Sequence, residues 1–163
     1  MESYMASLRK DIKSSSNLLV RTFKTFGKPL DYSVESLRHI ESFLDKELIN
    51  GQPKKGSFLS SGLGSKIFAI GAYTGEVIIK NSNGSKWETD DKDPQGEINV
   101  AITSLNGTTI WPVQRVMKRI MNGKEDDLFV YVKAAVEQHM KYDGEVPAGF
   151  DDVKPESKWW KFW

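Results

Sequence analysis

Cysteine is absent from this 163-residue chain, which excludes disulfides and thiolate chemistry. Histidine is scarce: His39 and His139 are the only two, and neither has a second histidine at metal-ligand spacing. No G-x-S-x-G nucleophile elbow is present, and the stretch 61–66 (SGLGSK) lacks the spacing of a phosphate-binding loop. We therefore expect no metal, no cofactor and no catalytic set.

An excess of charge of one sign is also missing. Lys and Arg number 23 and Asp and Glu 22, so the net charge is +1 and creates no overall field that would attract nucleic acid or an anionic membrane. The longest apolar stretch, residues 67–79, is interrupted by Gly71, Gly75 and Glu76, which argues against a membrane span. The first residues show no basic-then-apolar signal peptide. These absences predict a cytoplasmic protein without a nucleic-acid or membrane partner.

What is present is ordinary globular composition. Hydrophobic residues make up 39% and charged residues 28% of the sequence, and a chain of this length can bury a core of its own. We expect a single domain over residues 1–163. Its last part, residues 143–163, reads as a turn-rich aromatic tail that ends in the sequence WWKFW.

Helical periodicity dominates the first fifty residues. Apolar residues from Met5 to Phe26 recur at helical spacing, which predicts a helix that the serines at 14–16 could interrupt. A second helix is expected from an N-cap at Ser33, and Asn50-Gly51 would end it before a polar loop over 51–56. Its apolar stripe consists of Val34, Leu37, Ile40 (or Glu41), Leu44 and Leu48.

The segment 58–81 is ambiguous. Read as a helix, it places Gly71 and Gly75 on one side, where another backbone could approach closely. Read as a hairpin, it gives strands over 66–73 and 76–80 around Thr74-Gly75. Because each glycine costs a helix about 1 kcal/mol relative to alanine, the pattern alone leaves both readings open.

Strand signals follow from residue 83 onward. We expect a short strand around Trp87, a strand over 98–102, a turn at Asn106-Gly107 and a return strand over 108–111. Pro112 then opens a helix that ends at residues 122–123, and Asp126 or Asp127 opens a last helix that reaches residue 140. The predicted class is α+β: N-terminal helices, a small antiparallel sheet of about three strands, and two C-terminal helices.

Five stretches carry a family resemblance: LDYSVESL (30–37), GAYTGEVI (71–78), Trp87, TTIWP (108–112) and RVMKRIMNG (115–123). In this order they resemble a family of small uncharacterised bacterial cytosolic proteins, over roughly residues 30–140. The resemblance implies that 58–81 is mainly helix, followed by three short strands and two helices. In size and composition the chain is also similar, more loosely, to the immunity proteins encoded beside secreted toxins.

Glu76 interrupts an apolar segment and therefore invites a closer interpretation. If its side chain faces inward, the buried charge requires a partner, which Arg115, Lys118 or Arg119 could supply. A structural ion pair is the favoured interpretation. A catalytic carboxylate would need a nucleophile or a second titrating group, and the sequence offers none nearby.

These features favour a non-catalytic protein-binding protein, in the first place a bacterial immunity protein that neutralises a toxin domain encoded by an adjacent gene. A small enzyme with an unrecognised site and an adaptor or regulator are the alternatives. Carboxylates could oppose the basic groove of a nuclease toxin, and tryptophans could anchor the interface. The candidates are Asp90, Asp91, Asp93, Glu97, Glu125, Asp126 and Asp127, with Trp111, Trp159, Trp160 and Trp163 as aromatic anchors.

Overall fold

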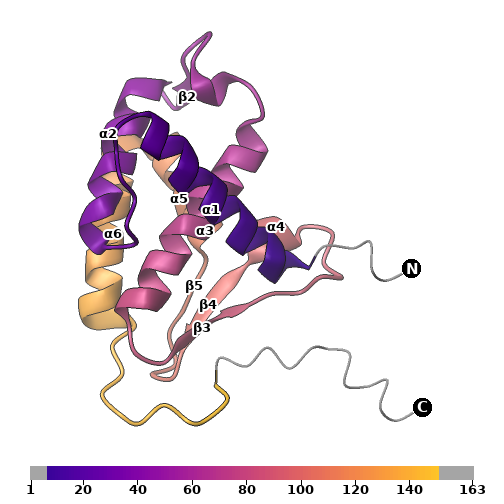
Figure 1. Ribbon diagram of the computed structural model, residues 1–163, viewed down its shortest axis with the longest axis vertical. Helices are drawn as coiled ribbons and strands as arrows, with labels where there is room; N and C mark the ends of the chain where they lie inside the picture. Colours follow the sequence, from indigo (N-terminus) through magenta and orange to yellow (C-terminus); the bar gives the residue numbers. More distant parts are fainter. Residues whose placement is uncertain (1–6, 151–163) are drawn as a thin grey trace.

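The structure is a computed structural model that describes residues 7–150. It is a mixed α+β arrangement in which helices surround α3 and two small antiparallel sheets lie at opposite ends (Figure 1). The elements in order are α1 (Leu8–Thr25), η2 (Val34–Ser36), α2 (Leu37–Glu47), β1 (Leu48–Ile49), β2 (Gln52–Pro53), η3 (Phe58–Ser60), α3 (Leu63–Asn81), β3 (Ser85–Glu88), α4 (Gly96–Asn99), β4 (Ala101–Ser104), β5 (Thr109–Ile110), α5 (Pro112–Asn122), η4 (Gly123–Asp126), α6 (Leu128–Ala134) and the π-helical turn η5 (Ala135–His139).

The first helix runs without a break through its three serines. Ser7 caps it, because its Oγ accepts a hydrogen bond from the backbone N–H of Lys10 at 3.2 Å. Ser16 is fully buried, and its hydroxyl is hydrogen-bonded to the Tyr32 hydroxyl at 3.0 Å. This serine therefore faces the protein interior and does not interrupt the helix. The helix ends where Gly27 adopts a φ of +71°, a conformation that favours glycine.

Residues 63–81 form one helix, which resolves the ambiguity of this segment and excludes a hairpin at Thr74-Gly75. The two glycines make the expected close approaches. A Cβ at Gly71 would lie 2.8 Å from the Cα of Val113 on α5, and one at Gly75 would lie 2.1 Å from the ring of Trp87 on β3. The helix therefore tolerates these glycines because α5 and the sheet pack directly against its backbone.

The larger sheet has the order β3-β4-β5, and Trp87 pairs with Ile102, which pairs with Ile110. The strand expected over 98–102 lies further along the chain than predicted, since residues 96–99 form the helical turn α4 and β4 spans Ala101–Ser104. Asp93 accounts for the difference: it accepts hydrogen bonds from the backbone of Gln95 and the side chain of Asn99, local bonds that compete with strand pairing.

Asn50-Gly51 was predicted to end a helix before a polar loop, and that prediction is wrong. The two residues instead connect strands β1 and β2, with Leu48 opposite Pro53. Both have positive φ, +50° and +79°, as a type I′ hairpin turn requires. The preceding helix is also divided, because residues 34–36 form a 3₁₀ turn before α2 begins.

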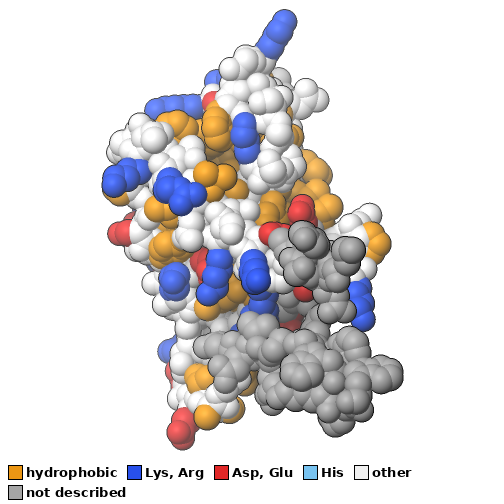
Figure 2. Space-filling model, turned by 45° about the vertical axis from the view of Figure 1, so that its right-hand side comes forward, with side chains coloured by type: hydrophobic (Ala, Val, Ile, Leu, Met, Phe, Trp, Pro, Cys, Tyr) orange, Lys and Arg blue, Asp and Glu red, His pale blue; other side chains and the backbone are white. Residues whose placement is uncertain are grey.

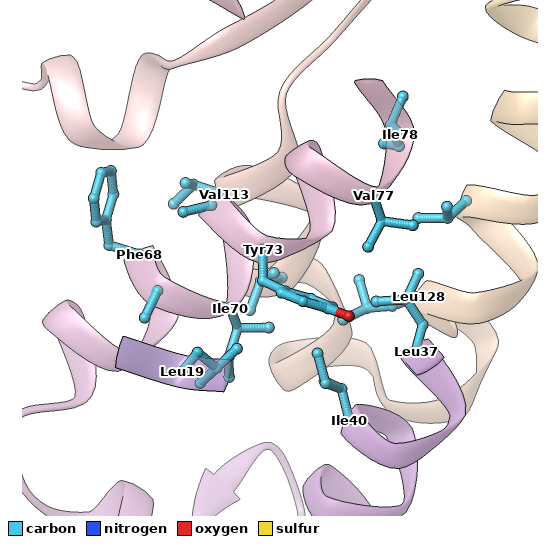
Figure 3. Close-up of a cluster of buried hydrophobic side chains, with 14 of the residues drawn as sticks. Leu19, Leu37, Ile40, Phe68, Ile70, Tyr73, Val77, Ile78, Val113 and Leu128 are labelled. Atoms are coloured by element: carbon cyan, nitrogen blue, oxygen red, sulfur yellow. The ribbon is translucent and has the colours of Figure 1, made fainter. Parts of the chain in front are cut away.

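The core gathers around Tyr73, which projects from the middle of α3 and is completely buried. Figure 3 shows its ring directed toward side chains of α2 and α6. Its hydroxyl is hydrogen-bonded to Ser36 Oγ at 2.6 Å and accepts a bond from the Tyr32 N–H at 2.9 Å. Burial, opposed by these two hydrogen bonds, raises the pKa of Tyr73 to about 12. Tyr73 therefore remains a neutral hydrogen-bonding group that connects α3 to η2.

Candidate functional site

Several of the candidate residues that the structure describes lie on α5 or on the elements beside it. Trp111, at its N-terminus, is 44% exposed, and Met121, in its last turn, is 67% exposed. Lys118 lies between them and is also exposed. Lys118 and Met121 are three residues apart and therefore lie on neighbouring positions of the helix surface, and Trp111 is the extended N-cap residue directly before its first turn.

Two neighbouring elements border this side of the helix. Gln114 Nε2 donates to the Ile98 carbonyl oxygen at 3.4 Å, so α4 lies alongside the N-terminal half of α5. Arg115 instead reaches Asp126 at 3.4 Å, on η4. Because consecutive helical residues point about 100° apart, α4 and η4 lie on opposite flanks of the exposed side. We call this region, comprising Ile98, Trp111, Gln114, Lys118 and Met121, the α5 surface.

The acidic loop before α4 forms one flank, and most of its carboxylates have local structural roles. Asp91 Oδ1 accepts the Leu8 N–H at 2.9 Å, at the start of α1. Asp90 accepts the N–H of Lys92 at 3.0 Å. The hydrogen bonds from Asn99 and Gln95 lower the pKa of Asp93. Glu97 is exposed and has no hydrogen bond or ion pair within residues 7–150, so it remains available to a partner.

The second acidic cluster borders the other flank and divides in the same way. Asp127 caps α6 by accepting the Val130 N–H at 2.9 Å. Asp126 accepts from Asn122 at 2.7 Å and pairs with Arg115. Glu125 is exposed and makes no such contact in the described part of the chain. Each flank of the α5 surface thus offers one uncommitted carboxylate, Glu97 or Glu125.

Sequence reasoning identified Trp111 and the carboxylates and missed Ile98, Lys118 and Met121. For Lys118 and Met121 the signal was the helical phase of α5: position 118 opposes the buried Val113, Val116 and Ile120, and position 121 lies outside that buried stripe. Ile98, 38% exposed, was assigned to a strand and therefore gave no such signal. Trp159, Trp160 and Trp163 lie outside the described residues.

The buried ion pair involves a different acid from the one expected. Glu76 is half-buried, and its Oε2 accepts a hydrogen bond from Trp87 Nε1 at 3.4 Å, so its predicted pairing with α5 is wrong. The buried carboxylate is Glu41 on α2, 4% exposed, whose two oxygens accept from Arg119 Nε at 2.9 and 3.1 Å. Its position on the apolar stripe of α2, between Leu37 and Leu44, was the signal in the sequence.

The surroundings of Glu41 explain why it is tolerated in the core. One of its oxygens also accepts the backbone N–H of Leu128 at 2.9 Å, and Arg119 extends the network to Asp45 at 2.8 Å. Burial raises the pKa of Glu41, against the opposing effects of the Leu128 and Arg119 hydrogen bonds. Partial burial also acts to raise the pKa of Asp45, but the hydrogen bond and charge of Lys124, with the charge of Arg119, lower it. The cluster ties α2, α5 and α6 together.

No arrangement typical of catalysis accompanies these contacts in the described part. Residues 7–150 contain no group of three or more acidic or histidine side chains that could hold a metal ion. A hollow of about 420 Å³ between the end of α3 and η5 is lined by Ser82, Glu137, Lys141 and Asp143 among others. The Ser82 hydroxyl is hydrogen-bonded to the Ile78 carbonyl and to Ser85, and no histidine lines the hollow. Nothing in it pairs a nucleophile with a base.

Among the described helices, none is both long enough and apolar enough to cross a membrane. Comparison of the chain with protein-family models, with curated proteins and with solved structures found no significant match.

Proposed function

We propose that this chain is a non-catalytic protein-binding protein and that the α5 surface receives its partner. The observation that carries the proposal is the exposure of Trp111 and Met121 at the two ends of α5, a helix that packs Val113, Val116 and Ile120 into the core. Exposed tryptophan and methionine are over-represented at protein interfaces, where they supply most of the apolar contact.

The chemistry of the surface indicates the kind of partner. Glu97 and Glu125 flank the apolar side chains without an ion pair among the described residues, so a partner with basic groups around an apolar recess would complement them. Uncommitted rim carboxylates accelerate encounter, and the central aromatic residue slows dissociation. Such a partner matches a nuclease-type toxin domain, whose phosphate-binding groove is basic. On this basis we propose the more specific role of a bacterial immunity protein, with cytoplasmic action.

The test begins with the product of the neighbouring gene, co-expressed with this protein. Trp111→Ala is expected to weaken the complex about 30-fold, the effect of losing a hot-spot residue worth ~2 kcal/mol, mainly through faster dissociation. Val130→Ala is the matched control, because Val130 is 62% exposed on α6 and is not part of the α5 surface. Thermal unfolding of both variants checks that neither is misfolded.

Charge reversal tests the flanks separately. The double variant Glu97→Lys with Glu125→Lys should associate more slowly and show weaker salt dependence. Glu137→Lys provides the control, since Glu137 is an exposed carboxylate on η5. Failure to bind the neighbouring gene product would refute the immunity role. Binding that Trp111→Ala and the double reversal both leave unchanged would refute the α5 surface as the binding site.

A further inference from the structure

A second unusual surface lies at the end of the molecule where α1 ends and the chain passes through β1, β2 and η3 into α3, at the top of Figure 1. Two aromatic side chains remain partly exposed there: Phe26 by 42% and Phe58 by 39%. Their ring centroids are 5.9 Å apart, and both rings rest on Phe43 of α2 at the same distance. The apolar contact on Phe43 holds the exposed rings in place.

Lysines surround these two rings. Lys24 and Lys28 flank the end of α1, Lys54 and Lys55 belong to the loop after β2, and Lys66 Nζ lies 3.9 Å from the Phe58 ring centroid. Within residues 7–150 none of these five has a carboxylate oxygen within 4.0 Å. We call Phe26, Phe58 and these five lysines the basic pole.

Two carboxylates at this end of the molecule, Glu47 and Asp45, offset only part of the charge of the five lysines. Glu47 accepts the backbone N–H of Leu59 at 2.9 Å, which fixes its carboxylate beneath η3. Asp45 is shared between Arg119 and Lys124. The net charge of +1 therefore hides a local excess of positive charge at this surface.

The basic pole includes a projecting loop. The loop after β2 projects as a tip at the top of Figures 1 and 2, and its end is coloured blue for lysine or arginine in Figure 2. Single-stranded nucleic acid needs open ring faces for base stacking along a groove. Here Lys66 covers one face of Phe58, and Phe26 lies nearly parallel to Phe43, at 15°, so both rings already have neighbours.

We propose that the basic pole binds the surface of an anionic lipid membrane. Partly exposed phenylalanines within a cluster of lysines match the interfacial region of a bilayer, where the rings enter the headgroup layer and the ammonium groups meet anionic headgroups. The inference is independent of the proposed function, because it uses none of the residues of the α5 surface.

The experiment is co-sedimentation of the full chain with vesicles of phosphatidylcholine containing phosphatidylserine, beside vesicles of phosphatidylcholine alone. The double variant Lys54→Gln with Lys55→Gln is expected to lower the partition coefficient about 25-fold, or about fivefold for each lysine, which corresponds to ~1 kcal/mol per basic residue at an anionic surface. Both lysines are exposed in a loop, so the folded state should be unaffected.

The matched control, Lys10→Gln with Lys13→Gln, removes the same charge from the opposite end of α1. The fifteen helical steps from Lys10 to Thr25 span ~22 Å, which exceeds two Debye lengths at physiological salt, so this variant should partition within twofold of the wild type. Failure to bind anionic vesicles, or equal losses in both double variants, would overturn the proposal. Vesicle binding that the Lys54→Gln and Lys55→Gln double variant leaves unchanged would also overturn it, because binding would then depend on other residues, such as the terminal tryptophans. Oligonucleotide binding that depends on these lysines, without vesicle binding, would identify nucleic acid instead.

Discussion

The close packing of α3 against the sheet makes Gly75→Ala an informative perturbation. An added Cβ would lie 2.1 and 2.3 Å from two ring atoms of Trp87 and 3.1 Å from Ile102 Cδ1, whereas Cβ atoms essentially never approach another heavy atom closer than 3.0 Å. Trp87 is 7% exposed and pairs with Ile102 across the sheet, so its ring cannot move without displacing β3 or β4. We expect overpacking to cost about 3 kcal/mol, the upper part of the usual range.

The same substitution also raises the helix propensity at position 75, and this stabilisation must be subtracted from the cost of overpacking. Alanine is about 1 kcal/mol better than glycine inside a helix, which leaves a net loss of ~2 kcal/mol for Gly75→Ala. Gly64→Ala is the matched control in the first turn of the same helix, because nothing lies within 4 Å of a Cβ at that position. That variant should be stabilised by a few tenths to ~1 kcal/mol, because only the propensity and the unfolded chain are affected.

Urea unfolding of both variants measures the difference, which we expect to be about 3 kcal/mol. Thermal unfolding should show the same order, with midpoints separated by about 6–12 °C for a chain of this size. Because both variants make the same chemical change, effects on the unfolded state largely cancel. Equal stability of the two variants would refute the packing of α3 on Trp87 and, with it, the helical register around Gly75.

Two further predictions concern the buried ion pair. Glu41→Ala should destabilise the protein by about 3–5 kcal/mol in urea unfolding, because Arg119 would remain buried without its main partner, whereas Glu76→Ala should cost less than about 1 kcal/mol. Equal losses of stability in the two variants would show that Glu41 is not the buried partner of Arg119. The second prediction follows from the pKa of Glu41, which is raised in the folded state, so that folding favours the protonated carboxyl. Protonation of Glu41 therefore adds to the free energy of unfolding. This addition is fully present below pH 4.5, the ordinary value, and is lost as the pH rises through the folded-state pKa. The stability of the wild type relative to Glu41→Gln should therefore increase as the pH is lowered from 7 toward 4.5, and a difference that stays constant or shrinks would contradict the burial effect.

Local pattern determined much of the architecture. Helical periodicity and the serine, proline and glycine signals near the helix ends identified α1, α2, α5 and α6, and Asn106-Gly107 identified the β4–β5 turn. The same signals failed where one local sequence is compatible with two different structures. Asn50-Gly51 serves a helix end and a type I′ hairpin equally well, and only the paired strands distinguish them.

Tertiary structure decided the packing of α3, the buried ion pair and the two exposed surfaces, because each of these depends on which elements meet in the fold. Glycines at 71 and 75 are a cost in an isolated helix and become an advantage only when α5 and Trp87 occupy the space they leave. Glu41 and Glu76 both interrupt apolar stripes, and what distinguishes them is the group that lies opposite: the Arg119 guanidinium for Glu41 and the Trp87 indole N–H for Glu76. The sequence contained the residues of the α5 surface and of the basic pole, but their gathering depends on contacts between segments far apart in the chain, such as Gln114 with Ile98 and Phe26 with Phe58.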